Sequence, residues 1–212
     1  MVFNTEIATN IAELLLQVNA IKIKKQNYFT WASGIKSPIY CDNRILLSYT
    51  EQRNKVKKAF KYLIENNFEN VSAISAVATA GIGIGALVAD VMDLPFSYVR
   101  DKSKAHGRQN NIEGDIANNA KIVVIEDLIS TGGSTIKVIE TLQQAGYEVI
   151  GAAAIFSYGF KKARVAFEKI SVPYYTLSEY NFLLDLLERK NFLTVEEKKR
   201  LQSWQANPKA FG

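Results

Sequence analysis

The sequence predicts an α/β protein with a central, mostly parallel sheet flanked by helices. From residue 71 onward, short apolar runs typical of buried strands alternate with segments whose apolar residues recur at helical spacing. No internal repeat, low-complexity tract or linker divides the 212 residues. We therefore expect a single domain over residues 1–212, in which about 1–45 form an N-terminal helix and a small subregion beside the sheet.

The N-terminal elements follow from capping residues and apolar spacing. Thr5 can cap a first helix, whose apolar positions 7, 11, 14, 15, 18 and 21 recur at helical spacing. Strand-like pieces come next, around Phe29–Trp31 and Ile39–Cys41. Thr50 is predicted to open a second helix with a stripe at positions 56, 60, 63 and 64.

The alternation then continues to the end of the chain. We expect strands at 71–77, 96–100, 122–125, 149–156 and 174–177, and helices at 80–92 (after a turn), 135–145 and 161–169. Residues 101–119 are polar and lack an apolar period, so they are predicted to form a loop. Ser178 and Thr194 are expected to cap two final helices, and Thr194 has the capping-box spacing with Glu197.

Composition limits the classes of function. The net charge of +5 suits a small anionic substrate as well as nucleic acid, but the basic clusters are scattered, so no nucleic-acid partner is predicted. No apolar run approaches the roughly 20 residues that span a bilayer, and the first residues lack the order of a signal peptide. The single cysteine, Cys41, fits a reducing compartment. We expect a cytoplasmic protein without a membrane partner, and no dedicated metal site.

The segment VIEDLISTGGST, residues 124–135, is the first candidate site. An apolar strand delivers Glu126 and Asp127 to the carboxyl edge of the sheet, where α/β proteins bind ligands. The glycines that follow let successive N–H groups converge on an anion at the start of a helix, and nearby hydroxyls add donors. An ordinary surface loop would explain the serines but not the paired acids.

A ribose 5-phosphate satisfies both halves of this segment. Its phosphate fits the Ser-Thr-Gly-Gly turn, and its hydroxyls can donate to Glu126 and Asp127. Breaking the bond at C1 of the sugar also generates positive charge, which nearby carboxylates would stabilise.

Three stretches together resemble a known family. Residues 124–135 resemble the phosphoribosyl-pyrophosphate (PRPP) motif of the phosphoribosyltransferases. FTWASGIKSPIYCDNR, residues 29–44, resembles an N-terminal segment of the orotate phosphoribosyltransferases, and RDKSKAHGRQNNIEG, residues 100–114, resembles their mobile catalytic loop. The stretches fall in the order of the family, and the similarity runs over most of the chain.

The resemblance implies a phosphoribosyltransferase-type fold with an N-terminal hood, and transfer of phosphoribose from PRPP to orotate in pyrimidine synthesis. It implies Mg²⁺ carried by PRPP, and a homodimer in which the 101–119 loop reaches the neighbouring site. The catalytic residues would be Arg100, Lys104 and His106, the only histidine. The residues that bind PRPP would be these three together with Glu126, Asp127, Leu128, Ile129, Ser130, Thr131, Gly132, Gly133 and Ser134.

Further positions follow from the same resemblance. Thr79 and Ala80 would lie in the loop that faces pyrophosphate, and Ser130 and Tyr40 would contact orotate. Four positions depart from the family pattern: Ala32 and Ala80 replace lysines, Asp101 replaces a cation in the catalytic loop, and Tyr158 stands where some members have an arginine for the orotate carboxylate. Lys36 is a candidate for the missing cation.

Three other interpretations remain. Residues 81–86 fit the spacing G-x-G-x-x-A, and Asp101 lies about twenty residues further on, as in a dinucleotide-binding fingerprint. A transferase for a purine base would share the PRPP motif, but not the stretch at 29–44. A regulator that only senses PRPP would carry a DNA-binding module, and no helix-turn-helix pattern precedes the core.

Overall fold

The computed structural model describes residues 1–31, 33–100 and 111–208. A six-stranded sheet of order β10-β9-β8-β5-β6-β7 forms the centre of the molecule. All neighbouring strands in it run parallel except β6 and β7, which pair antiparallel. The predicted α/β fold with a mostly parallel central sheet is confirmed.

The described helices and strands have the following bounds. The helices are α1 Thr5–Gln17, the 3₁₀ helix η1 Asn43–Ser48, α2 Thr50–Asn67, α3 Ala80–Met92, α4 Gly133–Gln144, α5 Lys161–Lys169, α6 Tyr180–Arg189 and α7 Val195–Ala206. The strands are β1 Ile21–Ile23, β2 Phe29–Thr30, β3 Lys36–Ser37, β4 Ile39–Cys41, β5 Ala73–Val77, β6 Phe96–Val99, β7 Ile112–Glu113, β8 Lys121–Ile129, β9 Glu148–Ser157 and β10 Tyr174–Glu179.

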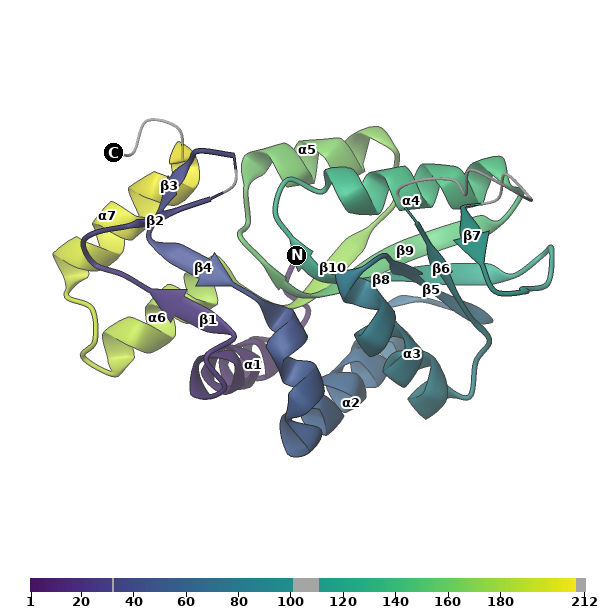
Figure 1. Ribbon diagram of the computed structural model, residues 1–212, viewed down its shortest axis with the longest axis horizontal. Coiled ribbons are helices and arrows are strands. Elements are labelled where there is room, and N and C mark those ends of the chain that lie inside the picture. Colours follow the sequence, from purple (N-terminus) through teal and green to yellow (C-terminus); the bar gives the residue numbers. More distant parts are fainter. Residues whose placement is uncertain (32, 101–110, 209–212) are drawn as a thin grey trace.

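Helices cover both faces of the sheet (Figure 1). The helices α4 and α5 lie on one face, and α1, α2 and α3 lie on the other. Strand β8 shows why its sequence is continuously apolar. Val123 and Ile125 belong to the core under α1–α3, whereas Ile122 and Val124 belong to the core under α4 and α5. A strand buried on both faces cannot alternate with polar residues.

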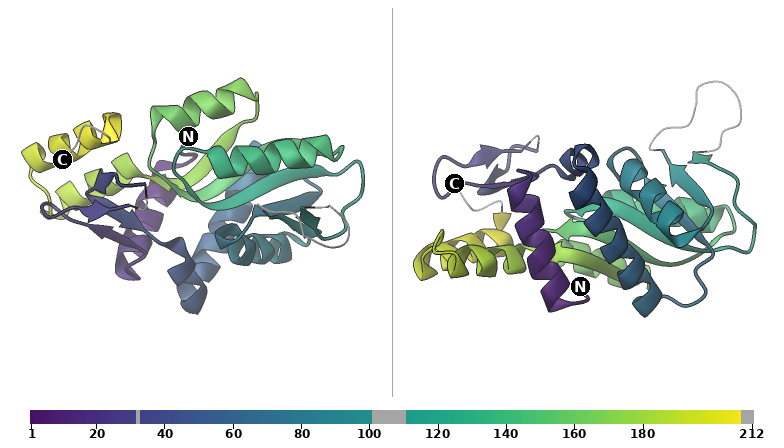
Figure 2. Two further views of the ribbon diagram at one scale, coloured as in Figure 1. Left: turned by 45° about the horizontal axis from the view of Figure 1, so that its top comes forward. Right: turned by 90° about the horizontal axis from the view of Figure 1, so that it is seen from below.

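The N-terminal hood is built from two short antiparallel pairs. Strand β1 pairs with β4, and β2 pairs with β3. The C-terminal helices α6 and α7 lie beside these strands, far from the hood in sequence (Figures 1 and 2). The indole N–H of Trp204 in α7 donates to the carbonyl oxygen of Lys36 in β3 at 2.9 Å. The hood therefore rests on the C-terminal helices. From the sequence, residues 1–45 alone were expected to form this subregion.

Several local predictions can be compared with the structure. Thr194 caps α7 in a full capping box with Glu197, as expected. The cap of α1 is Asn4 rather than Thr5, because the Asn4 side chain accepts from the N–H of Ile7. Ser178 caps no helix: it lies inside β10, and its buried hydroxyl donates to the carbonyl oxygen of Ala8 at 2.7 Å.

Gly151 allows the closest packing between β9 and α2. A Cβ atom added there would lie 2.0 Å from Cε1 of Phe68, the residue that ends α2. We expect Gly151→Ala to lower the free energy of unfolding by about 1–3 kcal/mol, because the core cannot accept the extra methyl without moving that ring. Urea denaturation measures this loss. In a Phe68→Leu background the same change should cost less, and an equal cost in both backgrounds would contradict the contact.

Candidate functional site

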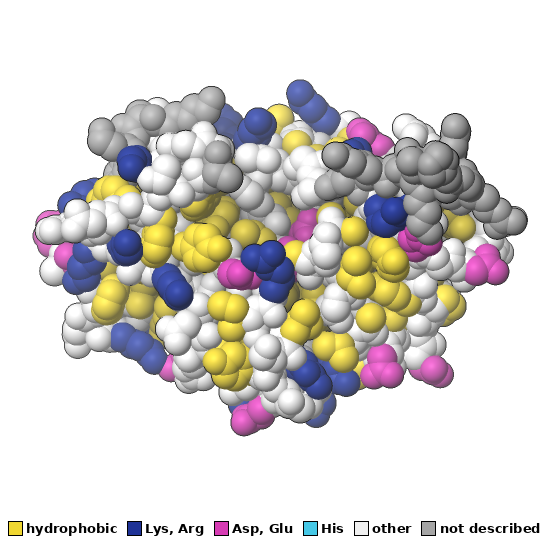
Figure 3. Space-filling view, in the orientation of Figure 1, with side chains coloured by type: hydrophobic (Ala, Val, Ile, Leu, Met, Phe, Trp, Pro, Cys, Tyr) yellow, Lys and Arg dark blue, Asp and Glu magenta, His cyan; other side chains and the backbone are white. Residues whose placement is uncertain are grey.

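Four strand ends meet at one edge of the sheet. Strands β9, β8, β5 and β6 are neighbours and run parallel, so their carboxyl ends point the same way. The polar residues after β8, the turn after β5 and Arg100 after β6 therefore come together, where ligands bind in open α/β sheets. The hood lies beside the same edge (Figure 1). Figure 3 shows acidic side chains at the surface between two areas of hydrophobic side chains.

Strand β8 continues further than its apolar run predicts. It ends at Ile129 rather than at 125, so Glu126 and Asp127 lie within the strand. Glu126 is only 4% exposed. Its Oε2 accepts hydrogen bonds from the hydroxyls of Ser134 and Thr135, each at 3.2 Å. This acid therefore connects β8 to the first turn of α4.

The environment of the two acids favours their protonated forms. Burial raises the pKa of the Glu126 carboxyl well above its usual range, and the neighbouring charge of Asp127 raises it further. Burial also raises the pKa of Asp127, although hydrogen bonds act against this shift. Two adjacent acids at a buried strand end can hold a proton between them and release it when a cationic group approaches.

Asp127 lies on the side of β8 that faces the hood. Its backbone carbonyl oxygen accepts a hydrogen bond from the side-chain amide of Asn43 at 2.6 Å. Asn43 is 2% exposed and begins η1, directly after β4. This bond joins the hood to the sheet at the site, so the position of the hood depends on the end of β8.

The Ser-Thr-Gly-Gly turn has the geometry of an anion site. Gly132 has φ of 82°, in the left-handed region that favours glycine, and α4 begins at Gly133 without a side-chain cap. The first N–H groups of α4 therefore remain available for an anion, which the helix dipole also favours. Ser130 and Thr131 lie in this turn, and a Cβ on Gly133 would find only the Thr131 hydroxyl, at 4.0 Å.

Leu128 and Ile129 have different surroundings from the rest of the segment. Leu128 lines a cavity under the hood. Ile129 has a fully buried side chain, and its carbonyl oxygen accepts from the N–H of Tyr158 at 3.2 Å. Ile129 therefore secures β8 to the end of β9.

Arg100 is the cation that the structure places at this edge. An Nη2 atom of Arg100 lies 3.0 Å from a carboxylate oxygen of Glu113, but both Nε and Nη2 are buried without a hydrogen-bond partner. Such donors are costly unless a ligand satisfies them. The backbone N–H of Arg100 donates to the carbonyl oxygen of Asn111 at 2.9 Å, so both ends of the intervening segment lie here. Lys104, His106 and Asp101 lie outside the described residues.

The turn after β5 corrects the dinucleotide interpretation. Helix α3 begins at Ala80, and Thr79 precedes it after a cis peptide bond from Ala78. The glycines at 81, 83 and 85 therefore lie inside the helix and not in a loop. A Cβ on Gly81 would lie 2.9 Å from the carbonyl oxygen of Ile125, and one on Gly83 would meet the side chain of Leu47. The glycines allow α3 to pack closely against its neighbours. The spacing of glycines alone cannot distinguish such a helix from a phosphate-binding loop.

A cavity of about 300 Å³ lies between the hood and the ends of β8 and β9. The residues that line it are Thr30, Trp31, Tyr40, Cys41, Leu128, Ser130 and Tyr158. It thus includes both predicted orotate contacts, Tyr40 and Ser130. Three of these residues, Trp31, Tyr40 and Tyr158, are aromatic and can pack against a flat ring.

Trp31 and Tyr158 form the inner wall of this cavity. Their rings are 5.0 Å apart, and Trp204 stands edge-on to Trp31 at 5.7 Å. Gln205 donates to the carbonyl oxygen of Tyr158 at 2.7 Å. Burial raises the pKa of Tyr158 far above its ordinary value, so the hydroxyl stays neutral. No sequence signal linked α7 to this cavity, because that contact spans most of the chain.

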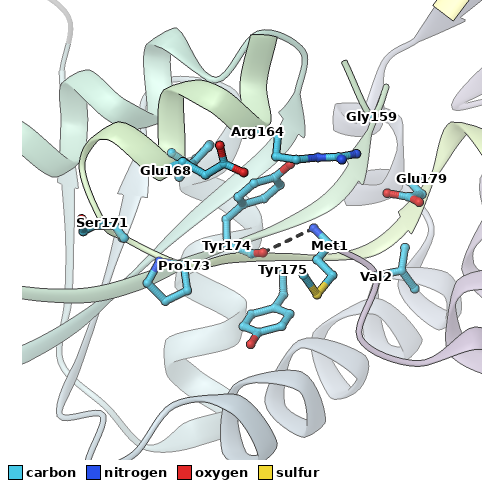
Figure 4. A pocket seen from close by; sticks show the side chains of 12 residues that line it. Met1, Val2, Gly159, Arg164, Glu168, Ser171, Pro173, Tyr174, Tyr175 and Glu179 are labelled. Carbon is cyan, nitrogen blue, oxygen red and sulfur yellow. Dashed lines mark hydrogen bonds between the residues drawn. The ribbon is translucent and has the colours of Figure 1, made fainter. Parts of the chain in front are cut away.

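A larger cavity, of about 620 Å³, lies elsewhere (Figure 4). It lies beside the edge strand β10, between α5 and the first residues of the chain, and Arg164, Glu168 and Tyr174 line it. None of the predicted site residues that the structure describes lines it. The smaller cavity is the better candidate site, because it adjoins the acids and the anion turn.

The chain was compared with known proteins. A family model described as the phosphoribosyl transferase domain matches residues 46–179. An orotate phosphoribosyltransferase of Staphylococcus epidermidis is 48% identical over 200 residues, which cover 94% of this chain and 98% of the relative. One of Listeria innocua is 46% identical over 206 residues, covering 97% and 99%.

Solved structures agree with this similarity. A crystal structure of orotate phosphoribosyltransferase from Aeropyrum pernix has a TM-score of 0.75 at 26% identity, and the match covers 87% of this chain and 99% of that one. An adenine phosphoribosyl transferase from Trypanosoma brucei, with a TM-score of 0.63 at 17% identity and coverage of 86% and 83%, shares the fold.

Proposed function

Since this chain belongs to the phosphoribosyltransferase family and, within it, to the orotate phosphoribosyltransferases, we propose how its own residues carry out that reaction. The enzyme transfers the 5-phosphoribosyl group from PRPP to orotate and forms orotidine 5-monophosphate and pyrophosphate. The observation that carries the assignment of the site is that the acids, the anion turn and the aromatic cavity adjoin at one sheet edge. The alternatives of a purine transferase and a PRPP sensor are not favoured.

The proposed arrangement places PRPP along the ends of β8, β5 and β6. The 5-phosphate binds the turn from Ser130 to Ser134, and the ribose hydroxyls donate to Asp127. Glu126 holds the turn through the hydroxyls of Ser134 and Thr135. Pyrophosphate then lies near Arg100 and the turn at Thr79 and Ala80. The unpartnered donors of Arg100 support this placement.

Orotate occupies the cavity under the hood, with its ring against Trp31, Tyr40 and Tyr158 and an edge toward Ser130. The bond from C1 to the pyrophosphate oxygen breaks as the bond from the orotate ring nitrogen to C1 forms, and the proton of that nitrogen leaves with the pyrophosphate. Positive charge develops on the ribose in this loose substitution, and the carboxylates of Glu126 and Asp127 stabilise it. Lys104 and His106 are proposed to stabilise the leaving pyrophosphate.

Mg²⁺ is proposed to enter with PRPP. Among the described residues, no group of three or more histidine, cysteine, aspartate or glutamate side chains could hold a metal ion. The two acids of β8 are the carboxylates nearest the ribose, so the site suits an ion held mainly by substrate oxygens and water. When bound, Mg²⁺ would neutralise charge on pyrophosphate.

We also propose a cytoplasmic homodimer, with the 101–119 loop reaching the neighbouring site. Within the described part of the chain, no helix has the length and apolarity needed to cross a membrane. Light scattering measures the mass in solution. The exchange of loops is tested by mixing two impaired variants, Lys104→Ala and Glu126→Gln, and measuring whether the activity rises above that of either variant alone. Activity should return only if one dimer can combine an intact loop with an intact acid pair.

The reaction itself is tested by incubating the protein with PRPP, Mg²⁺ and orotate and following the loss of orotate absorbance. We expect rapid loss with orotate and no product with adenine, guanine or hypoxanthine. Turnover of a purine base at a comparable rate would contradict the assignment of the cavity.

Asp127→Asn should weaken PRPP binding while leaving orotate binding nearly unchanged. The amide is a poorer acceptor for ribose hydroxyls than the carboxylate, and hydrogen bonds to charged groups contribute about 1.5–3 kcal/mol. The expected rise in the Kd for PRPP is about 10-fold or more. Calorimetry measures it. Asp93→Asn, an exposed change at the C-cap of α3, is the control, and wild-type affinity in Asp127→Asn would count against the ribose contact.

A further inference from the structure

The described residues that line the cavity under the hood supply no positive charge for its substrate. Orotate carries a carboxylate, and an anion bound in an aromatic cavity needs a cation or several donors. The described residues that line the cavity are aromatic, apolar or hydroxyl-bearing, together with Cys41, and none of them is a lysine or arginine. A side chain just beyond this lining would supply the charge.

Three cations of the hood have contacts that can be compared. Both guanidinium contacts of Arg44 go to the carboxylate of Asp42, at 2.7 and 2.8 Å, so its charge is already paired. The ammonium of Lys24 lies over the ring of Phe29, 4.5 Å from its centre. The ammonium of Lys36 donates to the hydroxyl of Thr30 at 2.8 Å. Among these, only Lys36 contacts a residue that lines the cavity, and its partner there is neutral.

The fold holds Lys36 in this position from both sides. Thr30 and Lys36 are direct partners in the β2–β3 pair, so their side chains lie on the same face. The carbonyl oxygen of Lys36 accepts from the buried indole of Trp204. The backbone of Lys36 is thus fixed by α7, while its exposed ammonium can turn from the Thr30 hydroxyl toward a ligand.

We propose that Lys36 binds the carboxylate of orotate at the mouth of the cavity and determines the preference for this base over uracil, which lacks that group. This inference rests on the proposed location of orotate under the hood. Thr30 positions the ammonium in the free enzyme, and the carboxylate replaces its hydroxyl as the partner. A charged pair of this kind is stronger than the bond to a neutral hydroxyl.

The test compares product affinities, which do not depend on turnover. Orotidine 5-monophosphate and uridine 5-monophosphate differ only in the carboxylate, so calorimetry with both isolates the contribution of that group. In Lys36→Gln we expect the preference for orotidine 5-monophosphate to fall about 10-fold or more, with uridine 5-monophosphate unaffected. Lys36→Arg should retain most of the preference, and kcat/KM for orotate should fall in parallel while the KM for PRPP stays unchanged.

Lys24→Gln is the matched control, because it removes a lysine from the same hood. An unchanged ratio of the two affinities in Lys36→Gln would overturn the proposal, and so would an equal loss in Lys24→Gln. If the wild-type protein converts orotate, either of these results would overturn the role of Lys36 and leave the proposed function intact. Absence of orotate turnover in the wild-type protein would instead overturn the proposed function, and the role of Lys36 with it.

Discussion

Lys104→Ala should lower kcat by about 10²–10³-fold, which is the usual cost of removing one charge-stabilising donor from a transition state. Lys104 lies in the segment 101–110, outside the described residues, so the expectation rests on the sequence resemblance and on where this segment begins and ends. Arg100 and Asn111 adjoin at the carboxyl edge of β6 through a 2.9 Å hydrogen bond. Steady-state kinetics with saturating PRPP and orotate measures the effect.

The matched control for this prediction is Lys102→Ala, two residues away in the same segment. It should alter kcat far less, because the family resemblance assigns it no contact. Both variants should unfold at the wild-type temperature. Unchanged kinetics in Lys104→Ala would remove the catalytic role of this lysine, and an equal loss in both variants would show that only the net charge matters.

Glu126→Gln should lower kcat/KM for PRPP by about 10²-fold. Glu126 Oε2 accepts from two hydroxyls at the start of α4, and Oε1 accepts from the N–H of Asp127. Glutamine has a single acceptor oxygen, so its NH2 group must face one of these donors. The first turn of α4 would then hold the 5-phosphate less firmly. Thr135→Val removes one of the two donors and should give a smaller loss, whereas Thr135→Ser should behave as wild type. Kinetics with PRPP as the varied substrate tests the series.

The same substitution should change the pH dependence of stability. The pKa of Glu126 is raised in the folded protein, so the folded state holds this proton more tightly than the unfolded state. The contribution of the protonated Glu126 side chain to stability is therefore fully present below the pKa of glutamate in the unfolded state, about 4.3. It is lost as the pH rises through the pKa of Glu126 in the folded state. Glu126→Gln is neutral throughout, so its unfolding temperature should exceed that of wild type at pH 8.

The difference in unfolding temperature between Glu126→Gln and wild type should become smaller as the pH falls toward 5. Thermal unfolding monitored across this range measures the difference between the two proteins. A constant difference would mean that Glu126 does not change its protonation in that interval. Lower activity together with higher stability would identify a buried acid that is retained for function.

The elements with a strong local signal could be predicted from the sequence. The strands and helices from residue 71 onward follow from apolar period, and the capping box at Thr194 follows from a three-residue spacing. The errors arose where a distant contact decided the outcome. Ser178 resembles a cap, but its hydroxyl donates to Ala8, about 170 residues away. The glycines after β5 resemble a loop but pack α3 against β8 and η1.

The sequence by itself determined the acids, the anion turn and the class of reaction, because these depend on neighbouring residues and on motifs that a short stretch contains. Only the tertiary structure decided how the two acids differ: the Glu126 side chain accepts from the hydroxyls of α4, whereas the backbone carbonyl of Asp127 accepts from Asn43 of the hood. It also decided that Trp204 and Gln205 support the cavity under the hood. Contacts between distant segments depend on how the layers pack, and apolar spacing along one segment does not encode its partner.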